Sequence, residues 1–251
     1  MSNKFRQGGG DLKELVEYRS ICTQTERFNT AVQHFDYKKD PEIWEEKPRF
    51  SPPGPKHEWH DSKEDSPISR TAYIVYLRNS NNIMIRGARN FLREARKGII
   101  ERAVLGIWQR NVKTSGNVDV VLASSSHNGI ATIRRNILVG IELNKDTNKE
   151  HAKIERQVIL QHLAASYLNP ETGILTLMTD LEDRWHFFWF AEGKRLMRYE
   201  ATRSEARFLI QYSLDKLGSE AEHISTPTSF LNRSCWSDLF STLDTITEAK
   251  F

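Results

Sequence analysis

The sequence has few cysteines and no long apolar run. Its two cysteines, Cys22 and Cys235, lie far apart and show no metal-type spacing, so we expect two free, buried thiols. No stretch approaches the ~20 apolar residues that a membrane-spanning helix needs, and residues 1–10 lack the apolar segment of a signal peptide. We therefore expect either an intracellular protein or a mature domain cut from something longer, in both cases without a membrane partner.

The motifs that mark several large enzyme classes are also missing. The sequence contains no P-loop, no GxSxG serine motif and no glycine fingerprint for dinucleotides. What is present is a globular composition, with 38% apolar and 27% charged residues. A formal net charge of +3 and a pI near 8.8 are compatible with a nucleic-acid partner and do not require one.

The chain divides into an arm, a core and a tail. Six of the eight prolines fall between Pro41 and Pro67, where they remove backbone donors and fix φ. We therefore expect residues 1–68 to form an N-terminal arm, partly helical and then a proline-rich linker. Residues 69–220 should form an α/β core, and residues 221–251 a helical tail packed on it.

The core shows alternating helical and strand patterns. Residues 71–77 read as a strand or a short helix. Apolar residues that step by four predict a helix over residues 84–109. Strands are predicted at 118–124, 137–145, 173–180, 184–192 and 194–201, and helices at 149–167 and 203–217. The aromatic residues on both faces of 184–192 indicate buried core rather than a base-stacking platform. This order predicts a mixed β-sheet flanked by helices.

Two of the predicted strands each carry an acid. Alternation along a strand places Asp119 on one face with Val121, and Glu142 on one face with Gly140 and Asn144. An unpaired carboxylate buried in a sheet is costly, and a divalent cation would offset that cost. Oxygen ligands suit Mg²⁺ or Mn²⁺. The acids therefore form either one shared metal site or two separate surface positions.

These segments resemble the PD-(D/E)XK, or restriction-endonuclease-like, nuclease superfamily. Its signature is a helix glutamate, an acid on one strand, (D/E)-x-K on the next, and a helix that often carries glutamine. The chain has KGIIERA at 97–103, VDVV at 118–121, GIELNK at 140–145 and ERQVILQ at 155–161. The matching residues are Glu101, Asp119, Glu142 and Gln157. The resemblance covers roughly residues 86–200 and implies a restriction-endonuclease-like core.

The resemblance implies metal-dependent cleavage of a phosphodiester, with DNA as the expected substrate. Asp119, Glu142 and the Leu143 carbonyl would ligate Mg²⁺ or Mn²⁺, Glu101 would act behind them or on a second ion, and Gln157 would hold water or phosphate. The sequence departs from the signature at Asn144, which stands where the lysine belongs. Lys145 is adjacent but faces the other side of a regular strand, while Lys149 or Lys153 could serve from the following helix.

Basic residues concentrate on both sides of the first acid. A helix over residues 84–109 would place several of them on one side, where they could follow a phosphate backbone or form a solvated face. Arg134 and Arg135 precede the second acidic strand. The expected nucleic-acid contacts are Arg89, Arg93, Arg96, Lys97, Arg134 and Arg135.

The segment LMTDLEDRWHFFWF adds a narrower resemblance, to the nuclease-type C-terminal domains of Crinkler effectors, where a TD turn precedes a WxFFxF-like strand. It implies an effector that acts inside a cell, in the nucleus (the host nucleus if secreted), on DNA or through a host protein. Two alternatives stay open beside an active nuclease. One is a catalytically impaired nuclease fold that binds nucleic acid or protein, and the other is an effector that works only through a host protein.

Overall fold

The computed structural model describes part of the chain in detail. Backbone is described for residues 28–29, 32, 35–44, 46–59, 66–80, 91–94, 103–107, 110–114, 118–123, 137–145 and 151–218. Side chains are described for all of these except residues 80, 91–94, 103–107, 110–114 and 214–218. The expected tail at 221–251 and most of the expected N-terminal helical region lie outside this part.

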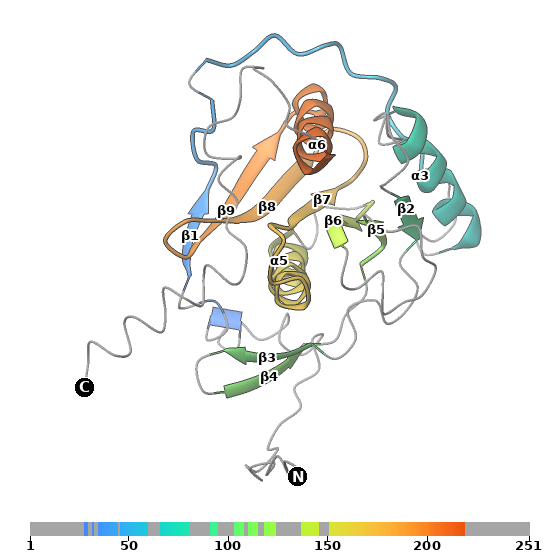
Figure 1. Cartoon of the computed structure of the whole chain (residues 1–251). Helices are drawn as coiled ribbons and strands as arrows, with labels where there is room; N and C mark the ends of the chain where they lie inside the picture. The colour runs from blue at the N-terminus through green and yellow to red at the C-terminus, as the bar shows by residue number, and fades with distance from the viewer. Residues whose placement is uncertain are drawn as a thin grey trace.

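One seven-stranded sheet organises the core (Figure 1), in the order β1-β9-β8-β7-β6-β5-β2. Its strands are β1 (Asp36–Lys39), β2 (Phe91–Glu94), β5 (Val120–Ala123), β6 (Ile137–Leu143), β7 (Leu175–Thr179), β8 (Trp185–Ala191) and β9 (Arg195–Ala201). β6 and β7 are parallel, as are β1 and β9, and the other neighbours are antiparallel. A separate hairpin pairs β3 (Ala103–Ile107) with β4 (Arg110–Thr114). The expectation of a mixed sheet flanked by helices is confirmed.

The prediction of a helix over residues 84–109 is wrong. Residues 91–94 form β2, which pairs antiparallel with β5, and residues 103–107 form one strand of the hairpin. The β-branched residues Val104, Ile107, Val112 and Thr114 favour the extended conformation there. Arg93 therefore lies in a strand, and Arg89, Arg96 and Lys97 lie outside the described residues.

Two helices begin at recognisable capping residues, and a third ends at one. The amide of Ser69 donates to Ser66 Oγ at 3.2 Å, and Pro67 opens α3 (Pro67–Ser80), so residues 71–77 are helical rather than extended. Thr202 and Glu205 form a capping box at the start of α6 (Arg203–Gly218). α5 (His151–Leu168) ends at Asn169.

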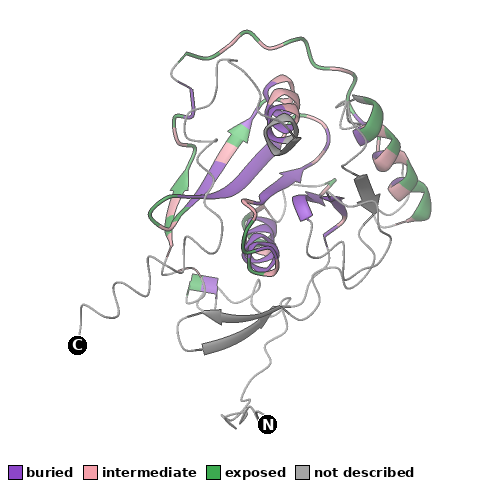
Figure 2. Cartoon of the chain, in the orientation of Figure 1, coloured by how far each residue is buried: buried purple, intermediate pink, exposed green. Residues whose placement is uncertain are grey.

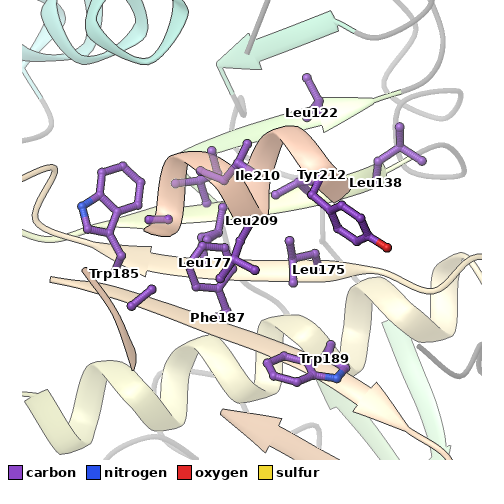
Figure 3. Close-up of a cluster of buried hydrophobic side chains, with 14 of the residues drawn as sticks. Leu122, Leu138, Leu175, Leu177, Trp185, Phe187, Trp189, Leu209, Ile210 and Tyr212 are labelled. Carbon is purple, nitrogen blue, oxygen red and sulfur yellow. The ribbon is translucent and has the colours of Figure 1, made fainter. Parts of the chain in front are cut away.

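Alternation along β8 sorts its side chains onto two faces of the sheet. Trp185, Phe187 and Trp189 pack with Leu209 and Ile210 of α6, and all are fully buried (Figure 3). α3 packs on the same face through Tyr73 and Leu77. The other face lies under α5, where Phe188 and Phe190 meet Ile154 and Val158. The aromatic strand is therefore core, as expected, and α5 and α6 cover opposite faces (Figures 1 and 2).

The proline-rich arm is a strap that runs along the core, and we use that name for residues 35–44 and 46–59. After β1 it places Trp44 and Phe50 against Phe208 of α6. It then reaches the β7–β8 turn, where Trp59 Nε1 donates to the Asp180 carbonyl at 2.8 Å. Past β1, these contacts lie on the α6 side of the sheet (Figure 1). Among the helices that the structure describes, none combines the length and hydropathy needed to cross a bilayer.

Candidate functional site

The two acids singled out in the sequence lie in neighbouring segments of the sheet, Glu142 in β6 and Asp119 in the bend before β5. The register pairs Val120 with Ile141 and Val121 with Gly140, so Asp119, one residue before β5, stands opposite Glu142. Val121 and Ala123 pack under Ala164 and Ala165 of α5, which identifies this face of β5. Val118 packs in the same cluster, so strict alternation does not continue through the bend at Asp119, and the expectation that the two acids share a face stays a prediction.

Asp119 lies against the peptide unit that follows Glu142. Its Oδ2 accepts a hydrogen bond from the Leu143 amide at 2.8 Å, in the place where a ladder partner would otherwise stand. The next amide, of Asn144, points to the opposite neighbour and donates to the Thr179 carbonyl at 3.0 Å. Because the amide and carbonyl of an extended residue face the same neighbouring strand, the Leu143 carbonyl is directed to the Asp119 side as well.

Glu142 is held by two glutamines of α5. Gln157 Nε2 donates to Oε1 at 2.5 Å, and Gln161 Nε2 donates to Oε2 at 2.8 Å. The Glu142 side chain is buried, with only 8% of the residue exposed. Both donors are neutral amides, so they fix the orientation of the carboxylate and do not themselves compensate its charge. Gln161 was not predicted as a site residue, although its i+4 spacing from Gln157 is a usable signal.

The remaining predicted residues divide into three groups. Asn144 follows β6 and is half-buried, and Lys145 is exposed in the turn after it. Lys153 is exposed on α5, four residues before Gln157 and therefore on the same side of the helix. The residues that lie outside the described part of the chain are Glu101, Arg89, Arg96, Lys97, Arg134, Arg135 and Lys149, and the side chain of Arg93 also lies outside it.

A second polar cluster, unforeseen in the sequence, lies on the same face and in the same row across the sheet. Glu142 pairs with Met178, Met178 with His186, and His186 with Glu200. Arg198, also on this face, donates to Asp40 at 3.0 Å, to Glu200 at 3.2 Å and to His186 Nδ1 at 3.1 Å. We call Tyr37, Lys39, Asp40, His151, Glu155, His186, Arg198 and Glu200 the Arg198 cluster.

His186 is a neutral imidazole of fixed tautomer. Burial, together with the positive charge of Arg198 and the neighbouring His151, lowers the pKa of His186 to about 3. A guanidinium only donates, so Nδ1 of His186 accepts and the proton sits on Nε2. The ring of His186 contacts the ring of His151 edge-on, with centroids 5.0 Å apart.

Glu155 joins α5 to this cluster. Its Oε1 accepts from Tyr37 Oη at 2.5 Å and lies 2.9 Å from Lys39 Nζ, and its Oε2 lies 3.3 Å from His151 Nε2. Burial alone would raise the pKa of Glu155, but the hydrogen bonds from Tyr37 and Lys39 and the charges of Lys39 and Arg198 outweigh it and lower the pKa. Burial and the bond to Glu155 raise the pKa of Tyr37.

This arrangement predicts a pH-dependent loss of stability. Because the folded pKa of Glu155 lies below its ordinary 4.5, its carboxylate stabilises the fold fully above that pH, and the contribution is lost as the pH falls through the folded value. At pH 7 we expect Glu155→Gln to lower the free energy of unfolding by about 1.5–3 kcal/mol. The difference in free energy of unfolding between the natural chain and Glu155→Gln should become smaller below pH 4.5. Urea denaturation of both proteins at a series of pH values measures it. A constant difference down to pH 3 would contradict the assignment.

The two acids are therefore linked through one peptide unit: Asp119 accepts the Leu143 amide, and two glutamines orient the buried carboxylate of Glu142. Comparison of the chain with protein-family models, with curated proteins and with solved structures gave no match.

Proposed function

We propose that the chain is a divalent-metal-dependent phosphodiesterase that cleaves nucleic acid, DNA in the first place, on a restriction-endonuclease-like core. One observation carries the proposal. The carboxylate of Asp119 accepts the amide of the peptide that joins Glu142 to Leu143, and Gln157 and Gln161 hold the carboxylate of Glu142.

The order of the elements supports the same proposal. An acid adjoins β5, a second acid lies in β6, and the helix that follows, α5, carries the glutamines. This is the order of the PD-(D/E)XK signature that the sequence resembles. The intracellular and nuclear location, and action as an effector, belong to the proposal as consequences of a DNA substrate and of the Crinkler resemblance.

The donor set fits Mg²⁺ or Mn²⁺. Two carboxylates and the Leu143 carbonyl are hard oxygen ligands, and Mg²⁺ commonly takes one or two carboxylates while it keeps several waters. Within the described residues, no group of three or more His, Cys, Asp or Glu side chains is arranged to hold a metal ion. The ion would therefore depend on Asp119, Glu142, the main chain, water and the substrate phosphate.

Each residue then has a separate task. A bound ion supplies an acidified water and neutralises charge on the phosphate. Asp119 and Glu142 provide the negative charge that binds it, and the glutamines keep Glu142 in one orientation. Lys153, on the same helix side as Gln157, is the described lysine best placed to approach the phosphate. Because the guanidinium of Arg198 already donates to Asp40, Glu200 and His186, it is a poor phosphate ligand.

The direct test is incubation of the purified full chain with plasmid, linear and single-stranded DNA and with RNA. We expect cleavage of DNA with Mg²⁺ or Mn²⁺ and none with EDTA. The metal alone should raise the melting temperature. If neither ion supports cleavage of any of these substrates, the proposal that the chain is a nuclease is rejected.

The Asn144→Lys variant should cleave faster than the natural chain. Asn144 follows β6 on the face of Glu142, so a lysine there would place a positive charge beside the acid pair. An electrostatic stabiliser of this kind is worth about 10²-fold in rate. Single-turnover cleavage measures it, and Asn144→Met, of similar length without charge, is the matched control. An equal gain in both variants would show that the charge is not the cause.

A second function is favoured by Asn144 itself. Without the signature lysine, the same fold would serve as a catalytically impaired module that binds nucleic acid or a host protein. It predicts salt-sensitive DNA binding that survives Asp119→Asn, and no rise in melting temperature with metal. For an effector that acts only through a host protein, we expect tight binding to that protein without nucleic-acid affinity.

A further inference from the structure

α5 contacts the sheet through two polar flanks with an apolar stripe between them. At 3.6 residues per turn, residues four apart lie about 40° apart around the helix. Ile154 and Val158 form the middle of the buried stripe. Gln157 and Gln161 lie on the flank that reaches β6, while Glu155 lies on the flank that reaches β1 and β9.

The Glu155 flank joins three parts of the chain that are distant in sequence. Tyr37 and Lys39 come from β1, and Arg198 Nε of β9 lies 3.7 Å from Glu155 Oε2. Glu155 is 7% exposed and Arg198 is also 7% exposed. A buried carboxylate with this many charged and hydrogen-bonding neighbours has one low-energy orientation, since any rotation leaves a donor unpaired.

Apolar contacts alone would not fix the rotation of α5 about its axis. The stripe around Ile154 and Val158 is non-directional, and a small roll of the helix would keep most of its buried area. The same roll would move Gln157 and Gln161 relative to β6, where hydrogen bonds weaken steeply with distance and angle. The directional contacts on the two flanks oppose each other, so each flank resists a roll that would break the other.

We infer that Glu155 is a positioning residue, which sets the roll of α5 and thereby holds the two glutamine amides on Glu142. This role of Glu155 rests on the proposed function in one respect, that Glu142 binds the metal.

If Glu155 positions α5, the strap also supports the site, because Tyr37 and Lys39 of the strap contact Glu155. β1 has only four residues, at the edge of the sheet with two exposed lysines, so its attachment depends on Tyr37, Lys39 and Asp40.

The experiment uses the full chain with Mn²⁺ alone as the probe. Glu155→Gln is the test, and Glu200→Gln is the matched control, because Glu200 contacts the same guanidinium but is not bonded to α5. We expect Glu155→Gln to weaken Mn²⁺ binding by about 10-fold, in the range typical of residues that orient a ligand, and to speed amide exchange across β1. Glu200→Gln should bind Mn²⁺ within about twofold of the natural chain.

Two further measurements keep the inference testable. Tyr37→Phe removes one donor to Glu155 and should show a smaller effect of the same sign, even if Glu155→Gln folds poorly. Nuclear magnetic resonance of the Gln157 and Gln161 side-chain amides should show both shifted in Glu155→Gln without metal.

The outcomes separate the two ideas. If the natural chain binds Mn²⁺ and both Glu155→Gln and Tyr37→Phe bind it equally well, Glu155 does not position the site, while the proposed function stands. If the natural chain neither binds Mn²⁺ nor cleaves nucleic acid, the proposed function fails. The chemical shifts of the Gln157 and Gln161 side-chain amides in Glu155→Gln then test the positioning role by themselves. Changed shifts support it, and unchanged shifts overturn it.

Discussion

Metal-dependent cleavage should fall by at least about 10²–10³-fold in Asp119→Asn and in Glu142→Ala. Asn in place of Asp119 can still accept the Leu143 amide, so the strand junction keeps its hydrogen bond and loses only the negative charge. Removal of the Glu142 side chain takes away a charge and leaves the Gln157 and Gln161 amides without that acceptor. Single-turnover rates with Mg²⁺ and with Mn²⁺ measure both effects.

The control removes one acid far from the pair. Glu192 is exposed in the β8–β9 turn, at the opposite end of β8 from His186, so Glu192→Gln makes the same change in net charge. It should cleave at the natural rate. Circular dichroism and melting temperature must show that all three variants are folded. If the two site variants cleave as fast as Glu192→Gln, the acid pair is not the catalytic site.

What the sequence predicts of the two acids depends on local rules. The register of β5 and β6 sets Asp119 beside the segment that carries Glu142, where it accepts the Leu143 amide, while a shared face of the two carboxylates stays a prediction. The helical spacing of apolar residues and the Asn169–Pro170 stop are also local signals, and the helices predicted at 149–167 and 203–217 lie within two residues of α5 and α6 at each end.

The regions that were not predictable depend on distant partners. β1 reads DYKK, which has no apolar alternation, and it is a strand only because β9 offers a parallel neighbour. Phe91 and Ala95 fit a helical spacing, but residues 91–94 are extended because they pair with β5 at the edge of the sheet. The Arg198 cluster joins residues up to 160 positions apart, Asp40 and Glu200, so no local sequence pattern predicts it.

The buried carboxylate of Glu205, at the start of α6, fastens the middle of the strap. Trp44 Nε1 donates to its Oε1 at 2.7 Å, and Tyr199 Oη donates to the same oxygen. Lys47 Nζ lies 3.1 Å from its Oε2, and the Thr202 amide closes the capping box. The Glu205 residue is 1% exposed. Burial and the bond to Glu205 raise the pKa of Tyr199, so that hydroxyl stays a donor.

Glu205→Ala should therefore destabilise the fold by about 3–5 kcal/mol, the range for removal of one partner from a buried charged group. It leaves the indole of Trp44 and the hydroxyl of Tyr199 without their acceptor, while it also opens the capping box. Urea denaturation followed by tryptophan fluorescence measures the loss. Limited proteolysis should show earlier cleavage in residues 46–59. Lys47→Ala is the matched control, because Lys47 is half-exposed and such pairs contribute only about 0–1 kcal/mol. If the two variants lose equal stability, Glu205 does not anchor the strap.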